Sequence, residues 1–184
     1  MNRTFARVAI AAAVLLAAGG CRNPFDPSAD IELTRLEVTG NGSYGGTSIV
    51  IYQTELAGPT YAFGDWVVTC RFTYKNKVSA YLNSVTITYT DIDGNPVTAY
   101  KAVGGRTFKI TFRIPGVRDD NFYYEGEGID SSLSLRVVDL KVIEELKAPP
   151  PGSKVIFADI VLRGQDDNGY DLRLEGRIAI FVYQ

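Results

Sequence analysis

Residues 66–74 read Trp-Val-Val-Thr-Cys-Arg-Phe-Thr-Tyr, and their alternation decides the fold class. Every second side chain from Trp66 to Tyr74 is apolar, and the side chains between them are mostly Thr or Arg. Because successive side chains of a strand point to opposite faces, this period of two predicts a strand with one buried face. Cys70 falls on that face, so we predict a buried thiol that packs as a small apolar group.

The same period of two recurs along most of the chain. Turns rich in Gly, Asp and Asn at residues 91–96 and 165–170 separate alternating segments, which predicts two hairpins. One short helix is expected at residues 139–147, where apolar residues are spaced by three. The expected strands are residues 32–39, 48–55, 66–74, 85–90, 97–100, 107–114, 133–137, 155–163 and 172–183.

Eight or nine short strands within residues 31–184 predict an all-β domain, a two-sheet antiparallel sandwich. The turn at residues 164–171 and the following strand, which ends Ile178-Ala179-Ile180-Phe181, carry a resemblance. This hairpin resembles the C-terminal hairpin of uncharacterised bacterial envelope lipoproteins with an immunoglobulin-like β-sandwich mature domain, and the match covers about a quarter of the chain. The resemblance implies an immunoglobulin/fibronectin-like fold and an envelope location, and it brings no catalytic residue.

Residues 1–20 have the layout of a secretory signal peptide. Arg3 and Arg7 precede an apolar run at residues 8–18, and two glycines follow it. The apolar run is shorter than the roughly 20 residues that a membrane-spanning helix needs. The alternative is a short N-terminal membrane helix.

The signal peptide ends in a sequence that resembles the lipobox of bacterial lipoproteins, Ala18-Gly19-Gly20-Cys21, with Ala18 where leucine is usual. The resemblance implies lipidation of Cys21 and attachment to a membrane through that lipid, the outer membrane rather than the inner because residue 22 is Arg and not Asp. Residues 21–30 contain two prolines and no apolar period, which predicts a flexible linker. The alternative is an ordinary signal peptide in which Cys21 is incidental.

Composition excludes several kinds of chemistry. The chain has no histidine, which rules out Ser-His-Asp and Cys-His catalysis and the commonest metal ligand. Only two cysteines are present, so a zinc site of Cys and His is excluded and an intrachain disulfide is not expected. The net charge of −2 argues against a nucleic-acid partner. We therefore expect no enzyme activity, no cofactor and no metal.

Residues 118–130 are the least strand-like part of the domain and the best candidate for a ligand-binding loop. The segment combines five carboxylates with three consecutive aromatic residues, which could stack on a sugar or a peptide. The alternative is that the aromatic residues cap the core and the acids are solvated. The candidate residues are Asp119, Asp120, Phe122, Tyr123, Tyr124, Glu125 and Glu127.

The turn at residues 91–95 has oxygen ligands at alternate positions, as at the start of a calcium loop. The residue at the twelfth position of such a loop is Ala102 instead of a bidentate glutamate. An Asp-Gly turn between two strands already explains the segment, so we expect a hairpin turn.

These patterns together predict a lipid-anchored cell-envelope protein with a non-catalytic binding or interaction domain. Its partner would be an envelope protein or a glycan. One alternative is a structural component of an envelope assembly, which would need a contiguous apolar surface patch. Another is a carboxylate-dependent glycan hydrolase, which would need two acids facing each other across roughly 5–10 Å.

Overall fold

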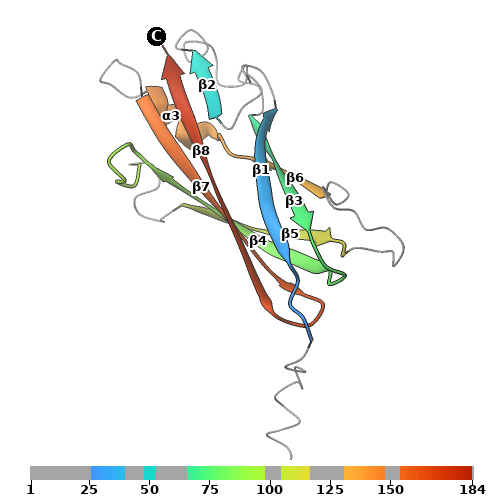
Figure 1. The fold of residues 1–184 in the computed structure, drawn as a ribbon. Coiled ribbons are helices and arrows are strands. Elements are labelled where there is room, and N and C mark those ends of the chain that lie inside the picture. Colours follow the sequence, from blue (N-terminus) through green and yellow to red (C-terminus); the bar gives the residue numbers. More distant parts are fainter. Residues whose placement is uncertain are drawn as a thin grey trace, which may run out of the picture.

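The computed structural model describes residues 26–39, 48–52, 66–97, 105–116, 131–147 and 154–183, and strands dominate this part of the chain (Figure 1). The one helix among these residues is α3. The elements are β1 (Ile31–Thr39), β2 (Ser48–Tyr52), β3 (Val67–Tyr74), β4 (Ala80–Thr90), β5 (Arg106–Ile114), β6 (Ser131–Arg136), α3 (Leu140–Lys147), β7 (Lys154–Asp166) and β8 (Asp171–Tyr183).

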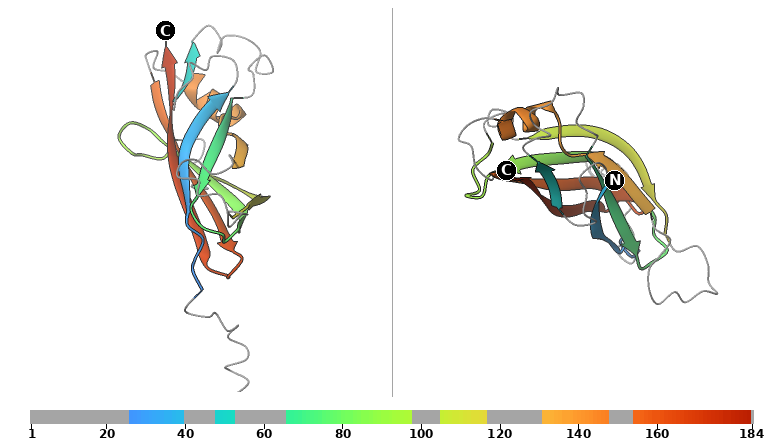
Figure 2. Two further views of the ribbon diagram at one scale, coloured as in Figure 1. Left: turned by 45° about the vertical axis from the view of Figure 1, so that its right-hand side comes forward. Right: turned by 90° about the horizontal axis from the view of Figure 1, so that it is seen from above.

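The strands form two sheets, which can be followed in the further views of Figure 2. A three-stranded sheet has the order β1-β3-β6, and a five-stranded sheet has the order β2-β8-β7-β4-β5. The predicted all-β, two-sheet arrangement is therefore confirmed. The prediction that every pair is antiparallel is wrong at one place, because β2 and β8 run parallel. Parallel neighbours need a long connection, and β2 and β8 lie near opposite ends of the domain sequence.

The core lies between the two sheets, and the alternating face of β3 supplies its centre. Val68, Cys70 and Phe72 are at most 1% exposed, which confirms the predicted inward face and the buried thiol. The Phe72 ring lies 5.7 Å, centroid to centroid, from the ring of Phe112 on β5, so this pair links the small sheet to the large one. Offset or tilted rings at this separation attract each other beyond the area that they bury.

Strand β4 begins at Ala80, five residues before the predicted start. Its pairing register shifts on both sides between Leu82 and Ser84, as a β-bulge does. The bulge moves the buried positions from even to odd numbers, Ala80 and Leu82 before it and Val85 after it. An alternating pattern that changes phase cannot be recognised as one strand.

The predicted helix is confirmed, and its first residue is fixed by a cap. The Oδ1 of Asp139 accepts a hydrogen bond from the backbone N–H of Val142 at 3.0 Å. A carboxylate there satisfies a helix N–H that has no partner within the helix. Val142, Ile143 and Leu146 are buried, so the apolar face of α3 packs into the core.

Residues 27–30, which fall in the expected linker, are hydrogen-bonded to one end of the domain. The backbone N–H of Ala29 donates to Asp166 Oδ2 at 2.8 Å, and Asn168 Nδ2 donates to the carbonyl of Pro27 at 2.8 Å. Asn76 Nδ2 donates to the carbonyl of Ser28 at 2.7 Å. The chain therefore enters β1 beside the β7–β8 turn, as Figure 1 shows.

Candidate functional site

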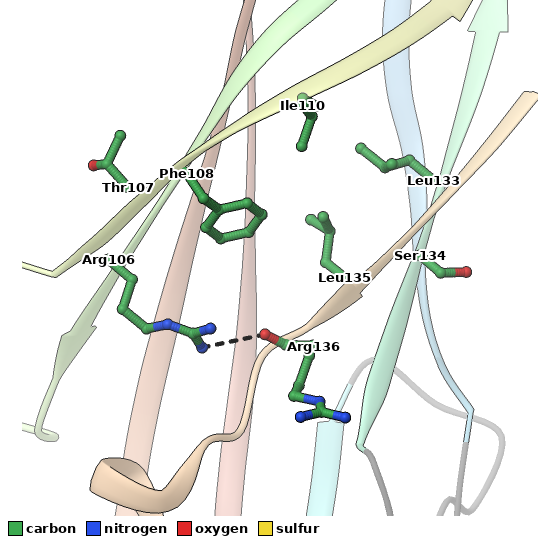
Figure 3. A pocket seen from close by; sticks show the side chains of 8 residues that line it. All are labelled: Arg106, Thr107, Phe108, Ile110, Leu133, Ser134, Leu135 and Arg136. Carbon is green, nitrogen blue, oxygen red and sulfur yellow. Dashed lines mark hydrogen bonds between the residues drawn. The ribbon is translucent and has the colours of Figure 1, made fainter.

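The two sheets leave a hollow between β5 and β6, which are edge strands of different sheets. On the opposite side, β1, the other edge strand of the small sheet, packs on the large sheet, where its Leu33 and Leu36 lie over Gly176 of β8. The hollow, here called the β5–β6 groove, has a volume of about 490 Å³ (Figure 3). It is lined by Arg106, Thr107, Phe108, Ile110, Leu133, Ser134, Leu135 and Arg136.

The floor of the groove consists of apolar side chains that the fold leaves partly exposed. Phe108 and Ile110 face inward from β5, and Leu133 faces inward from β6. These three side chains are only half-buried, whereas their neighbour Leu135 is 3% exposed. Each lies on the core-facing side of its strand, but no further strand follows β5 or β6 in either sheet among the described residues. Among the described residues, the core of the sandwich is therefore open on this side.

One end of the groove is closed by a polar cluster around Arg106. The Nε of Arg106 lies 3.3 Å from Asp139 Oδ2, and Nη1 donates to the carbonyl of Arg136 and to the hydroxyl of Tyr89, both at 3.3 Å. The Tyr89 hydroxyl donates to the carbonyl of Val137 at 2.5 Å. These bonds join β4, β5, the end of β6 and the N-cap of α3, so they fix the spacing of the two walls.

The two strands that flank the groove are basic. Strands β5 and β6 carry Arg106, Lys109, Arg113 and Arg136 and have no carboxylate, in a chain with a net charge of −2. Arg106 is paired with Asp139, whereas Lys109 and Arg113 form no ion pair within the described residues. The guanidinium of Arg113 lies over the Tyr81 ring, 5.4 Å from its centroid. The exposed face of β5 therefore presents two cations to solvent.

Two buried side chains, the thiol of Cys70 and the phenol of Tyr89, have raised pKa values. Burial raises the pKa of Cys70 from 9.0 to about 12. Burial also raises the pKa of Tyr89 from 10.0 to about 12, against the opposing effect of the hydrogen bond from Arg106. A thiol with a raised pKa is a poor nucleophile, so Cys70 has a packing role.

We expect the free energy of unfolding to fall as the pH rises from about 9 to about 12. The unfolded chain loses the Cys70 and Tyr89 protons near their ordinary pKa values, whereas the folded chain keeps them up to about 12. The unfolded state thus binds fewer protons in this window. Urea titrations across it test the expectation. In Cys70→Ala the decline should begin near pH 10 instead of pH 9, and an unchanged pH profile in that variant would contradict the buried thiol.

The turn at residues 91–95 uses its own carboxylate to close the loop. Asp91 Oδ1 accepts hydrogen bonds from the backbone N–H groups of Asp93 at 2.9 Å and Asn95 at 2.8 Å. The bond from Asn95 is the main cause that lowers the pKa of Asp91 below its ordinary value. Gly94 has a φ of 83°, as such a turn requires. Within the described residues no group of three His, Cys, Asp or Glu side chains could hold a metal ion.

The structure does not describe the candidate residues that the sequence singled out. Asp119, Asp120, Phe122, Tyr123, Tyr124, Glu125 and Glu127 fall outside the described residues, as does Cys21. The structure does describe β5 and β6, the two strands that residues 117–130 connect. These strands form the two walls of the groove. The sequence predicts alternating strands at residues 107–114 and 133–137, which contain Phe108, Ile110 and Leu133, and it does not indicate a groove between them. The one feature of the sequence that could have indicated this surface is the charge of β5, because all the charged residues of this strand are cations.

The fold and the groove together define the class, an all-β, two-sheet sandwich whose described residues leave one side open. No protein-family model and no curated protein sequence matches the chain. Among the described residues, no helix has the length and apolar character needed to cross a bilayer.

Proposed function

We propose that this protein is a lipid-anchored cell-envelope module whose immunoglobulin-like domain binds a partner in the β5–β6 groove without catalysing a reaction. The groove is the observation that carries the proposal. Phe108, Ile110 and Leu133 remain half-buried around a hollow of about 490 Å³. Contiguous apolar surface with a polar rim is typical of binding sites, because covering it removes that surface from water.

The order of the strands supports the immunoglobulin-like assignment. In immunoglobulin domains one sheet contains strands A, B and E, and the other contains C, F and G with C′ at its edge. The sheet β1-β3-β6 corresponds to A, B and E, and β5-β4-β7-β8 corresponds to C′, C, F and G. In such domains binding residues are commonly found on a sheet edge or on loops at one end.

The lining of the groove supports binding rather than catalysis. Its residues are Phe, Ile, Leu, Arg, Ser and Thr, with no carboxylate and no thiol. These side chains can hold a ligand by apolar contact, hydrogen bonds and charge. The sequence contains no histidine, the commonest general base.

The N-terminal segment supports attachment at a fixed end of the domain. Asp166, Asn168 and Asn76 hold residues 27–30, so at most six residues, 21–26, separate the lipid on Cys21 from this hydrogen-bonded segment. Residues 21–26 reach roughly 20 Å at full extension. The end of the domain with the β7–β8 turn would then lie close to the membrane.

The attachment is tested by the intact mass of the protein extracted from membranes of its own or a related bacterium. We expect a species that starts at residue 21 and carries added acyl mass, and we expect the acyl mass to be lost in Cys21→Ala. Three acyl chains give stable attachment, whereas one gives only marginal binding. A full-length or unmodified product in the unsubstituted protein would overturn the anchor.

Binding in the groove is tested by photo-crosslinking in the membrane-attached protein. A photoreactive residue replaces Leu133 in the groove, and in a matched control it replaces Arg173, an exposed residue on β8. We expect one adduct, identifiable by mass spectrometry, from position 133 and not from position 173. The adduct should be lost when Ile110→Asp is added, provided that the melting temperature shows a folded domain. Equal adducts from both positions, or none from 133, would contradict the proposed function.

A further inference from the structure

Among the described residues, strand β5 has one edge that pairs with no other strand. Within the described residues it pairs only with β4, and it contains nine residues with no proline. A strand edge presents a row of N–H and C=O groups that can pair with another extended chain. Natural edges are often blocked by proline, by a bulge or by a charge that points inward. Strand β5 has a bulge at Ile110 and Thr111, which stand opposite Asn83 because Leu82 pairs with Phe112 and Ser84 pairs with Lys109. The strand pairs regularly with β4 on both sides of this bulge, and an added strand would pair with these two regular stretches.

The two faces of β5 determine which side chains would be contacted by a strand of another chain that pairs with its edge. Phe108 and Ile110 face the groove, Phe112 faces the core beside it, and Lys109 and Arg113 face solvent on the other side. A strand that pairs with β5 places its own side chains alternately on these two faces. Its groove-facing side chains would meet apolar carbon, and the others would meet cations.

The positive charge of β5 favours an acidic strand as its added neighbour. Residues with opposite charge attract across neighbouring strands, and like charges directly opposite repel. Lys109 and Arg113 have no ion pair within the described residues, so an acidic neighbour would gain these contacts. A second copy of β5 would bring another set of cations to the same edge, which disfavours self-association.

We propose that the groove binds an extended, acidic segment of a partner protein, which adds as a strand along β5. Apolar residues at alternate positions of the segment enter the groove against Phe108, Ile110 and Leu133. Carboxylates at the positions between them lie beside Lys109 and Arg113. Main-chain hydrogen bonds to β5 provide affinity, and the two sets of side chains provide specificity. This inference rests on the proposed function and names the chemistry of the partner.

The test uses the full chain and a synthetic fluorescent peptide, Glu-Val-Glu-Ile-Glu-Val-Glu-Ile-Glu, with fluorescence anisotropy as the readout. We expect saturable binding that weakens with salt. The double variant Lys109→Glu/Arg113→Glu should weaken it at least about tenfold, because two attractive contacts become repulsive. Leu133→Asp should weaken it by a similar factor, because a carboxylate enters the apolar floor. Arg163→Glu, an exposed cation on the interior strand β7, is the matched control and should leave affinity unchanged.

A second readout is hydrogen exchange at the amides of β5. Peptide binding should slow exchange of β5 amides that do not bond to β4, and amides of β8 should not change. A peptide with lysine in place of glutamate should not bind. Equal binding of the lysine peptide, or β5 amides that exchange equally fast with peptide bound, would overturn strand addition.

Other occupants of the groove give distinct results, and each overturns the proposal. If the peptide binds only after residues 118–130 are replaced by a Gly-Ser linker of equal length, the groove belongs to the chain's own segment. If sedimentation shows a dimer that competes with the peptide, the groove belongs to a second copy. A specific photo-crosslinked partner at position 133 together with failure of the acidic peptide would reject the acidic strand and leave the proposed function standing. Absence of that partner would reject the proposed function itself.

Discussion

Replacing Gly164 by alanine is expected to lower the free energy of unfolding of the domain by about 3 kcal/mol or more. A Cβ atom at this position would lie 1.9 Å from the carbonyl oxygen of Tyr81 and 2.8 Å from the Cα of Leu82. Both are backbone atoms of β4. The contact therefore cannot be relieved by rotating a side chain, and β4 and β7 would have to separate.

The position of Gly164 explains why the approach is so close. Leu82 pairs with Gly164 and Ser84 pairs with Arg163, so the bulge in β4 lies directly opposite. Chemical denaturation compares Gly164→Ala with Gly94→Ala, which adds a Cβ where no atom lies within 4 Å. Gly94→Ala should cost only the roughly 1 kcal/mol of a left-handed residue other than glycine. Equal stability of the two variants would show that β4 does not approach Gly164 as described.

Phe72→Ala should cost about 3–5 kcal/mol, the other large effect. Phe72 is 1% exposed and lies between the sheets, against the ring of Phe112. Truncation removes the buried ring and leaves a cavity that two hydrogen-bonded sheets cannot close. Because proteins of this size are stable by only about 5–15 kcal/mol, such a loss consumes much of the total.

Phe112→Ala is the matched control, because it removes the other member of the same ring pair. Phe112 is half-buried beside the open side of the sandwich, so its ring leaves water less completely. We expect Phe112→Ala to cost clearly less than Phe72→Ala in urea denaturation monitored by circular dichroism. Equal losses would mean that Phe112 is as buried as Phe72, which contradicts an open side at β5.

Local patterns predict those parts of the fold in which the pattern is uninterrupted. The alternation of residues 66–74 and the turn at 165–170 predicted β3 and the β7–β8 hairpin, and both are confirmed. The start of β4 was missed because a bulge shifts the phase of its alternation at Leu82 to Ser84. The direction of β2 was missed because alternation within one strand carries no information about its neighbour.

The groove depends on pairing across long sequence distances, which is why sequence reasoning did not find it. Phe108, Ile110 and Leu133 alternate with polar residues in the predicted strands, and in the structure they pack against the core while staying partly exposed. Whether an inward face is covered depends on which strand lies next to it. Strands β5 and β6 are consecutive among the described strands but belong to different sheets, and only the fold reveals that both are edges. The predicted loop at residues 118–130 stays a prediction.

Everything proposed about binding depends on the side of the sandwich between β5 and β6 being open. The most direct test is the rate of thiol labelling in a Cys21→Ser chain that carries Ile110→Cys or Leu133→Cys, with Arg173→Cys as the exposed reference. The buried Cys70 is the internal reference, because it should label only after unfolding. An open groove predicts labelling of both new thiols within about tenfold of the Arg173→Cys rate. Thiols at positions 110 and 133 as protected as Cys70 would contradict the open side, and with it the binding site.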